Sequence, residues 1–194
     1  MTNPRLANSR IAIIVGSNRR ASINRALAIA LTKLAPQFDF TFVGIDDLPI
    51  YGQDIEAPLP PAVARFKDEI AAADGLIVVT PEHNRSIPAV LKNAIDWGAR
   101  PYGQNSWADK PVFVTGASPG AIATALGQHH LRYVLGVLGA LVLGGEAYIT
   151  FKPNLINEKG EIGDESTARF LRGFLDRFAT LVARVSPRAE RSAA

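Results

Sequence analysis

I-A-I-I-V-G-S-N-R-R-A-S-I-N, residues 11–24, is the stretch that decides the fold. Its five leading apolar residues do not alternate with polar ones, a pattern typical of a strand buried on both faces of a parallel sheet. A helical pattern follows, with apolar residues at positions 27, 29, 30, 31 and 34. Ser22 stands where its hydroxyl can cap the first turn of that helix. The stretch therefore predicts a strand, a short polar loop and a helix.

The predicted loop gathers groups that bind phosphate. Ser17, Arg19, Ser22 and Asn24 supply hydroxyls, a guanidinium and an amide. The N-terminus of the following helix adds free N–H groups and a dipole that favours negative charge. The loop matches neither the dinucleotide fingerprint G-x-G-x-x-G nor the Walker A motif. The alternative is an ordinary strand–helix turn that happens to be polar.

Length and composition restrict the class of protein. The 194 residues are 47% hydrophobic and 20% charged, which predicts one soluble domain over residues 1–194 with an ordered core at about 10–185. No apolar run is long enough to cross a bilayer, and the first residues lack the apolar core of a signal peptide. We therefore expect a cytoplasmic protein without a membrane partner. The absence of cysteine excludes disulfides and thiolate nucleophiles.

The charge pattern favours small anionic ligands. The formal charge is +3, and much of the excess lies in Arg19, Arg20 and Arg25 and in the C-terminal tail. No basic stripe of the kind that binds nucleic acid is present. His129 and His130 are neighbours on a predicted helix, so their side chains point about 100° apart and cannot easily share an ion. No metal site is predicted.

Strands and helices alternate along the rest of the chain. Further strands are predicted at residues 38–45, 76–80 and 111–115, and a final strand over 141–149 that Gly144 and Gly145 interrupt. Further helices are predicted at 63–73, 89–99, 122–138 and 167–185. This alternation predicts an α/β fold with a doubly wound, five-stranded parallel sheet in the order 2-1-3-4-5. In such a sheet the ligand crevice lies at the carboxyl ends of strands 1 and 3.

Three loops at that edge carry a resemblance to a known family. They read G-S-x-R-x-x-S-x-N at residues 16–24, P-E-x-N-x-S-I-P at 81–88 and G-A-S-P-G at 116–120. Together with L-K-N-A-I-D-W-x-x-R-P at 91–101, they resemble the NADPH-dependent FMN reductases, which are flavodoxin-like quinone, azo and chromate reductases. The resemblance covers roughly residues 10–185. It implies FMN as cofactor, NADPH or NADH as electron donor, and a homodimer or homotetramer.

The resemblance also implies roles for residues in these loops. Those implied at the FMN phosphate are Ser17, Arg19, Ser22, Ile23 through its backbone amide, and Asn24. Those implied at the isoalloxazine ring are Pro81, Glu82, His83, Asn84 and Ser118. His83 and His129 stand where the family commonly has tyrosine, and by resemblance His129 and Glu146 lie at a contact between dimers.

Residues of the second loop allow other interpretations. Glu82 and Asn84 are also common turn formers. Arg85 has a planar fork of donors that suits phosphate or sulfonate oxygens, and we expect it to bind the nicotinamide donor or an anionic acceptor. The alternative for Arg85 is a side chain that projects into solvent.

The expected function is hydride transfer from NAD(P)H through FMN to a quinone or a similar small acceptor, such as an azo dye, chromate or free flavin, by a ping-pong mechanism. The flavin carries the chemistry, so no catalytic side chain is expected. The alternative is a flavodoxin-type electron carrier or an FMN-binding module without turnover. A carrier that docks on basic reductases would present an acidic surface. This chain is basic, which favours the enzyme.

The predicted helices at 89–99 and 122–138 are apolar around much of their circumference. One sheet face cannot cover that much apolar surface. The sequence therefore predicts a homo-oligomer.

Overall fold

The computed structural model describes residues 9–185, and the predicted disordered tail at 186–194 lies outside them. Its parallel sheet has the order β2-β1-β3-β4-β5, which confirms the predicted doubly wound topology. The strands are β1 (Arg10–Val15), β2 (Asp39–Val43), β3 (Gly75–Val79), β4 (Pro111–Ser118), β5 (Leu141–Val142) and β6 (Tyr148–Thr150).

The C-terminal edge of the sheet differs from the prediction. In place of one interrupted strand, two short strands pair with the same side of β4. β5 lies beside the start of β4, where Pro111 faces Leu141, and β6 lies beside its end, where Gly116 faces Tyr148. Gly145, at φ +98°, adopts the left-handed region between the two strands, which lets the chain step out of the sheet and return.

β4 is also longer than predicted. Residues 116–118 continue the strand, because β6 supplies their hydrogen-bonding partner. Only Pro119 and Gly120 of the motif G-A-S-P-G remain outside the strand. Ser118 is therefore presented by a paired strand end, which is more rigid than a free loop.

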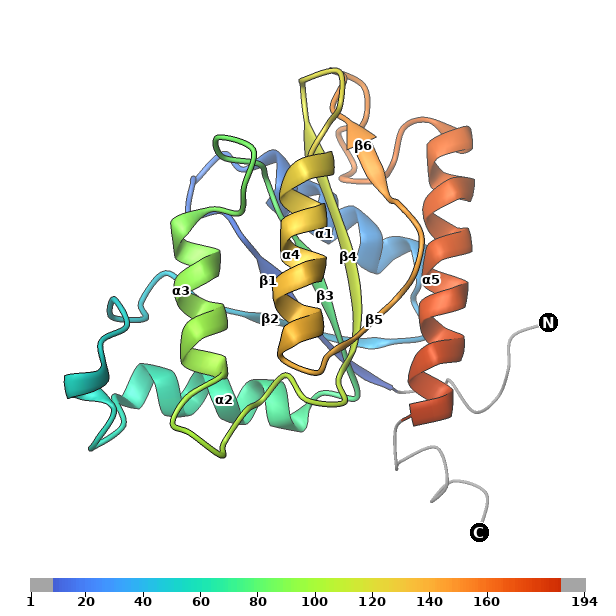
Figure 1. The fold of residues 1–194 in the computed structure, drawn as a ribbon. Coiled ribbons are helices and arrows are strands. Elements are labelled where there is room, and N and C mark those ends of the chain that lie inside the picture. The colour runs from blue at the N-terminus through green and yellow to red at the C-terminus, as the bar shows by residue number, and fades with distance from the viewer. Residues whose placement is uncertain (1–8, 186–194) are drawn as a thin grey trace, which may run out of the picture.

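Helices cover both faces of the sheet (Figure 1). They are α1 (Ile23–Leu34), α2 (Pro61–Ala72), α3 (Ala89–Gly98), α4 (Ala125–Val137) and α5 (Glu165–Val185), with a short 3-10 helix at Gln53–Ile55. α2, α3 and α4 pack on one face, and α1 and α5 pack on the other. α5 begins two residues earlier than predicted, because the carboxylate of Asp164 accepts from the N–H of Thr167 at 2.8 Å and caps the helix.

Two apolar cores lie on the two faces of the sheet. Ala12 and Ile14 of β1 belong to the core under α2, α3 and α4, whereas Ile11 and Ile13 belong to the core under α1 and α5. All four are 1% exposed or less, as the unbroken apolar run predicts for a strand covered on both sides. Within residues 9–185, no helix combines the length and apolar character needed to cross a bilayer.

Parallel strands bring the ends of β1, β3 and β4 to one edge of the sheet. The ends of β3 and β4 approach each other so closely that a Cβ on Gly116 would lie 1.9 Å from the carbonyl oxygen of Thr80. Glycine is therefore required at position 116, and the close approach draws together the two loops that follow.

Candidate functional site

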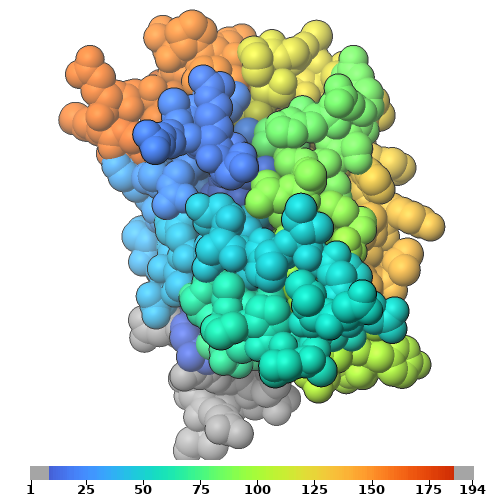
Figure 2. All heavy atoms as spheres, turned by 90° about the vertical axis from the view of Figure 1, so that its left-hand side faces the viewer, coloured from blue at the N-terminus to red at the C-terminus, as the bar shows by residue number. Residues whose placement is uncertain are grey.

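A pocket of about 230 Å³ opens at this edge, and all three motif loops line it. Figure 2 shows the blue loop after β1 and the green loop after β3 side by side at the upper edge of the molecule. All but one of the predicted cofactor residues line the pocket; the exception is Asn84. The lining residues are Ser17, Asn18, Arg19, Ser22, Ile23, Asn24, Pro81, Glu82, His83, Ala117, Ser118 and Pro119.

The start of α1 presents free donors to this pocket. The hydroxyl oxygen of Ser22 accepts from the N–H of Arg25 at 3.2 Å, so its proton remains available to a ligand. Within residues 9–185, the backbone N–H groups of Ile23 and Asn24 meet no acceptor, as is usual in a first helical turn. Hydroxyl and amide donors at a helix N-terminus fit the phosphate of FMN.

The side chain of Asn24, a predicted phosphate ligand, pairs instead with the backbone of β4. Its Nδ2 donates to the carbonyl of Ala117 at 2.9 Å, and its Oδ1 accepts from the N–H of Ala117 at 2.8 Å. The residue is only 1% exposed. The carboxamide thus ties the start of α1 to the end of β4, while the backbone N–H of Asn24 still faces no acceptor of this chain.

A tight turn shapes the second loop. His83 and Ser86 exchange two backbone hydrogen bonds of 2.9 Å, and the two residues between them adopt positive φ, at 50° for Asn84 and 66° for Arg85. This is the pattern of a type I′ turn, in which asparagine is common and arginine is not. Asn84 is exposed and lies outside the lining of the pocket, which agrees with the alternative of a turn former.

Glu82 is turned toward α4. Its side chain is 7% exposed; Oε2 accepts from the N–H of Gly127 at 2.9 Å and Oε1 from Nη1 of Arg85 at 3.1 Å. Gly127 lies in the first turn of α4, so the carboxylate satisfies a free helical donor and interacts favourably with the helix dipole. Glu82 thus attaches the second loop to the start of α4.

The sequence did not predict that α4 contributes to the site. A Cβ on Gly127 would lie 3.2 Å from the carbonyl oxygen of Ser86, and the hydroxyl of Ser86 lies 2.7 Å from Nδ1 of His130. α4 therefore supports the second loop at both ends. Within residues 9–185, no three His, Asp or Glu side chains form a group that could hold a metal ion.

Comparison with known proteins identifies the family. Residues 9–153 match the family described as NADPH-dependent FMN reductase. The chain is 47% identical over 175 residues to a 2-hydroxy-1,4-benzoquinone reductase from a Burkholderia species, covering 89% of this chain and 96% of that protein. It is 46% identical over 175 residues to a quinone reductase from Pseudomonas putida, covering 89% and 94%.

A solved structure shows the same fold. The fold superimposes on FerB, a flavoenzyme NAD(P)H:(acceptor) oxidoreductase from Paracoccus denitrificans, with a TM-score of 0.88 and 42% sequence identity, over 92% of this chain and 99% of that one. None of these three relatives is named as an electron carrier. The chain belongs to the NADPH-dependent FMN reductase family, and it is an FMN-dependent NAD(P)H oxidoreductase.

Proposed function

We propose that this chain reduces quinones with electrons from NAD(P)H, and that the pocket formed by the three motif loops is where it does so. One observation carries the proposal: loops from three separate parts of the chain meet around free phosphate donors at the start of α1. Relatives named as quinone reductases, at 46–47% identity over most of the chain, support a quinone as the acceptor.

The residues that line the pocket form two groups, one for the phosphate of FMN and one for its ring. We assign the FMN phosphate to the hydroxyls of Ser17 and Ser22, the guanidinium of Arg19 and the backbone N–H groups of Ile23 and Asn24. Residues 81–83 of the second loop and Ser118 of the third loop would hold the isoalloxazine ring. When bound, FMN supplies the ring that takes hydride from the nicotinamide and passes it to the acceptor. The protein contributes binding, orientation and nearby charge.

Kinetics test the proposed function. The purified holoprotein should oxidise NADPH with menadione, and double-reciprocal plots should be parallel, because one open pocket admits donor and acceptor in turn. Absence of turnover with the flavin bound would contradict the proposal. Intersecting lines would contradict the ping-pong order.

Variants test the phosphate end. Arg19→Ala and Ser22→Ala should each weaken FMN binding about tenfold or more, because hydrogen bonds to charged groups contribute about 1.5–3 kcal/mol. Ser22→Thr keeps the hydroxyl and serves as the control. Equal FMN affinity in both alanine variants and the parent, measured by flavin fluorescence, would show the assignment to be wrong.

We also propose that Arg85 contacts an anionic donor or acceptor. Its guanidinium pairs with Glu82, yet the side chain is 64% exposed and keeps donors available. Arg85→Gly is the cleaner test, because glycine adopts the positive φ of this position without strain, whereas alanine does not. A higher KM for NADPH or an anionic quinone, at unchanged kcat, is expected. Unchanged KM values would leave Arg85 in the role of a turn residue.

We further propose a cytoplasmic homodimer or homotetramer that associates through α4. Four large apolar side chains between 45% and 70% exposed lie on and just before α4: Ile122, Leu126, Tyr133 and Val137. Their spacing places them along one side of the helix. By contrast, α3 has no exposed large apolar residue, since Leu91, Ile95 and Trp97 are buried and Val90 is partly buried, so the predicted surplus of apolar surface is found on α4 alone of the two helices. His129 is also exposed, as a contact residue requires.

A further inference from the structure

A second pocket, of about 370 Å³, lies between the phosphate loop and the end of β2. It shares Ser17, Asn18 and Arg19 with the flavin pocket, so the two pockets are neighbours on either side of one loop. Its lining residues are Val15, Ser17, Asn18, Arg19, Arg20, Arg25, Phe42, Val43, Gly44, Ile45 and Asp46. Nothing in the reaction described above uses Arg20, Arg25 or Phe42.

The second pocket holds positive charge that the protein does not neutralise. Three arginines and one acid, Asp46, line it. The guanidinium groups of Arg19, Arg20 and Arg25 form no hydrogen bond or ion pair with any residue between 9 and 185. Elsewhere, carboxylates pair with the arginines Arg65, Arg85, Arg100 and Arg172. Unpaired guanidinium groups around a concave surface attract an anion, and their planar forks suit phosphate oxygens.

The second pocket also has an aromatic side chain on which a flat ring of a ligand could stack. Phe42 lies on the edge strand β2 and is 37% exposed, which is unusual for a phenylalanine. The guanidinium of Arg25 lies 5.7 Å from the centroid of the Phe42 ring. An aromatic face and a guanidinium plane are the two surfaces on which bases stack in proteins.

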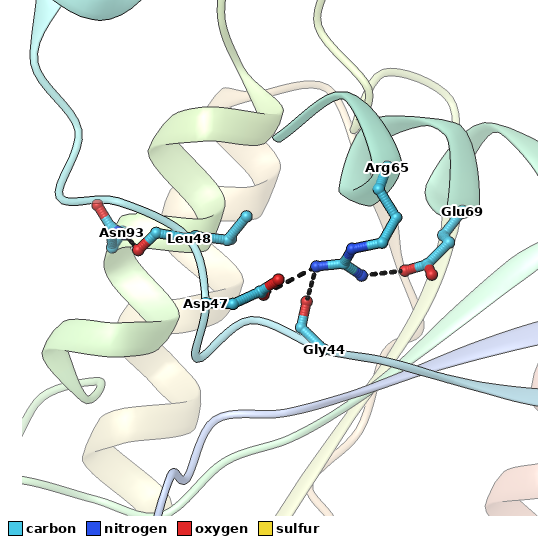
Figure 3. A network of polar contacts seen from close by, with 6 residues as sticks. All are labelled: Gly44, Asp47, Leu48, Arg65, Glu69 and Asn93. Carbon is cyan, nitrogen blue, oxygen red and sulfur yellow. Dashed lines mark hydrogen bonds and ion pairs between the residues drawn. The ribbon is translucent and has the colours of Figure 1, made fainter. Parts of the chain in front are cut away.

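The wall opposite the phosphate loop is held in place from outside the pocket. Arg65 of α2 donates to the carbonyl of Gly44 at 3.2 Å and to the carboxylate of Asp47 at 2.8 Å (Figure 3). Glu69 accepts from the same guanidinium at 2.9 Å. Arg65 thus ties the residues after β2 to α2 through Gly44 and Asp47.

We propose that the second pocket binds the adenosine 2′-phosphate end of NADPH, through Arg20, Arg25 and Phe42. This inference rests on the proposed function, in which NAD(P)H delivers hydride to FMN in the adjoining pocket. A ligand of this pocket must combine a phosphate with a flat ring, and it must extend across the shared loop to the flavin site. NADPH has the phosphate and the ring, and its nicotinamide is the end that must reach the flavin. NADH lacks the 2′-phosphate, so Arg20 and Arg25 make the enzyme prefer NADPH. FMN itself brings one phosphate, for which the start of α1 already has donors.

A double variant separates this site from the flavin site. Arg20→Gln combined with Arg25→Gln removes both cations and leaves the residues assigned to FMN intact. The kcat/KM for NADPH should fall about tenfold or more, whereas kcat/KM for NADH should change less than about twofold. The matched control is Arg169→Gln combined with Arg184→Gln, which removes the same charge from exposed positions on α5 that line neither pocket. The control should retain the parent's ratio of the two kcat/KM values.

Direct binding supplies a readout that does not depend on turnover. By calorimetry, the parent holoprotein should bind 2′,5′-ADP more tightly than 5′-AMP, and the double variant should lose that difference. Asp46→Asn should act in the opposite direction and tighten 2′,5′-ADP, because it removes the one carboxylate of the lining.

Several results would overturn the proposal. They are a parent that binds 2′,5′-ADP no better than 5′-AMP, an equal loss of NADPH and NADH efficiency in the double variant, and a double variant that releases FMN. An equal loss with both donors would mean that the arginines attract anions without selecting the 2′-phosphate. Release of FMN would mean that they bind the phosphate of FMN. A holoprotein that binds 2′,5′-ADP as expected but shows no quinone turnover would contradict the proposed function and leave this site supported.

Discussion

At the end of β4, the carboxamide of Asn24 pairs with Ala117 as a neighbouring strand residue would, accepting from its N–H and donating to its C=O. The two residues are 93 positions apart in the sequence. This pair joins the loop that we assign to the FMN phosphate to the strand that presents Ser118. Asn24 is therefore a positioning residue for two parts of the site.

Asn24→Ala should leave the buried N–H and C=O of Ala117 without partners and lower the free energy of unfolding by about 2–4 kcal/mol. The loss should be measurable by urea unfolding of the FMN-free protein, where a residue that acts only on phosphate would have no effect. Asn24→Asp places a buried carboxylate oxygen against the carbonyl of Ala117, so its loss should be at least as large as that of Asn24→Ala. The exposed Asn154→Ala is the control. If the FMN-free Asn24→Ala protein is as stable as the parent, the positioning role is wrong.

At the scale of elements, the close approach of β3 and β4 depends on one glycine. Gly116→Ala should destabilise the protein by about 3 kcal/mol or more, because its Cβ would meet a backbone oxygen of Thr80 that cannot move aside. Gly173→Ala on α5 is the matched control, since an added Cβ there would meet no atom within 4 Å outside its own helix backbone and chain neighbours. Alanine should stabilise the helix there by about 0.5–1 kcal/mol. Thermal unfolding that ranks the two variants in the reverse order would contradict this account.

The start of α5 depends on Asp164. The hydroxyl of Thr167, that of Ser166 and the N–H of Thr167 donate to one carboxylate oxygen at 2.6, 2.7 and 2.8 Å. These hydrogen bonds, that of the Thr167 hydroxyl most of all, hold the pKa of Asp164 well below its ordinary value of 3.8. The ionised carboxylate therefore contributes stability above that ordinary value, and this stability is lost as the pH falls toward the lower folded pKa.

Asp164→Ala should lower the melting temperature at pH 7 by about 2–4 °C. The difference between variant and parent should shrink in acid, where the parent loses its ionised cap as well. Melting curves recorded between pH 7 and the acid limit of folding check both statements. A difference that stays constant with pH would show that the charge of Asp164 does not contribute.

At the scale of the whole molecule, α4 links the proposed contact between subunits to the flavin site, because the second motif loop packs against it. Glu82 caps the first turn of α4, and the exposed Leu126 and Val137 lie along its outer side. We therefore expect association through α4 to stabilise the conformation of the second loop as well.

Leu126→Glu combined with Val137→Glu should convert the oligomer to a monomer, because burying two carboxylates in an apolar contact is costly. Ile29→Glu is the control, since Ile29 is 42% exposed on α1, on the opposite face of the sheet. Light scattering at micromolar concentration should report the parent and the control as oligomers. A monomeric parent would end the hypothesis.

Much of the fold could be predicted, because it depends on patterns within short stretches. The apolar run at residues 11–15 predicted a strand covered on both faces, and Ser22 predicted the start of α1. Alternation of strands and helices then predicted the sheet order, since right-handed crossovers leave few topologies. The motif loops predicted which edge holds the site, because the ends of parallel strands meet at one edge.

Other features were decided by tertiary structure alone. Gly144 and Gly145 predicted the interruption of the last strand, but the pairing of both halves with β4 depends on the length of β4, which the residues at 141–149 do not encode. The side chains of Asn24 and Glu82 were predicted at the cofactor, yet they pair with Ala117 and Gly127. The sequence by itself determined which polar groups the site receives, because loops carry their donors locally. Which of those groups remain free for a ligand was decided only in the folded molecule, because buried polar groups first satisfy one another over long distances in the chain.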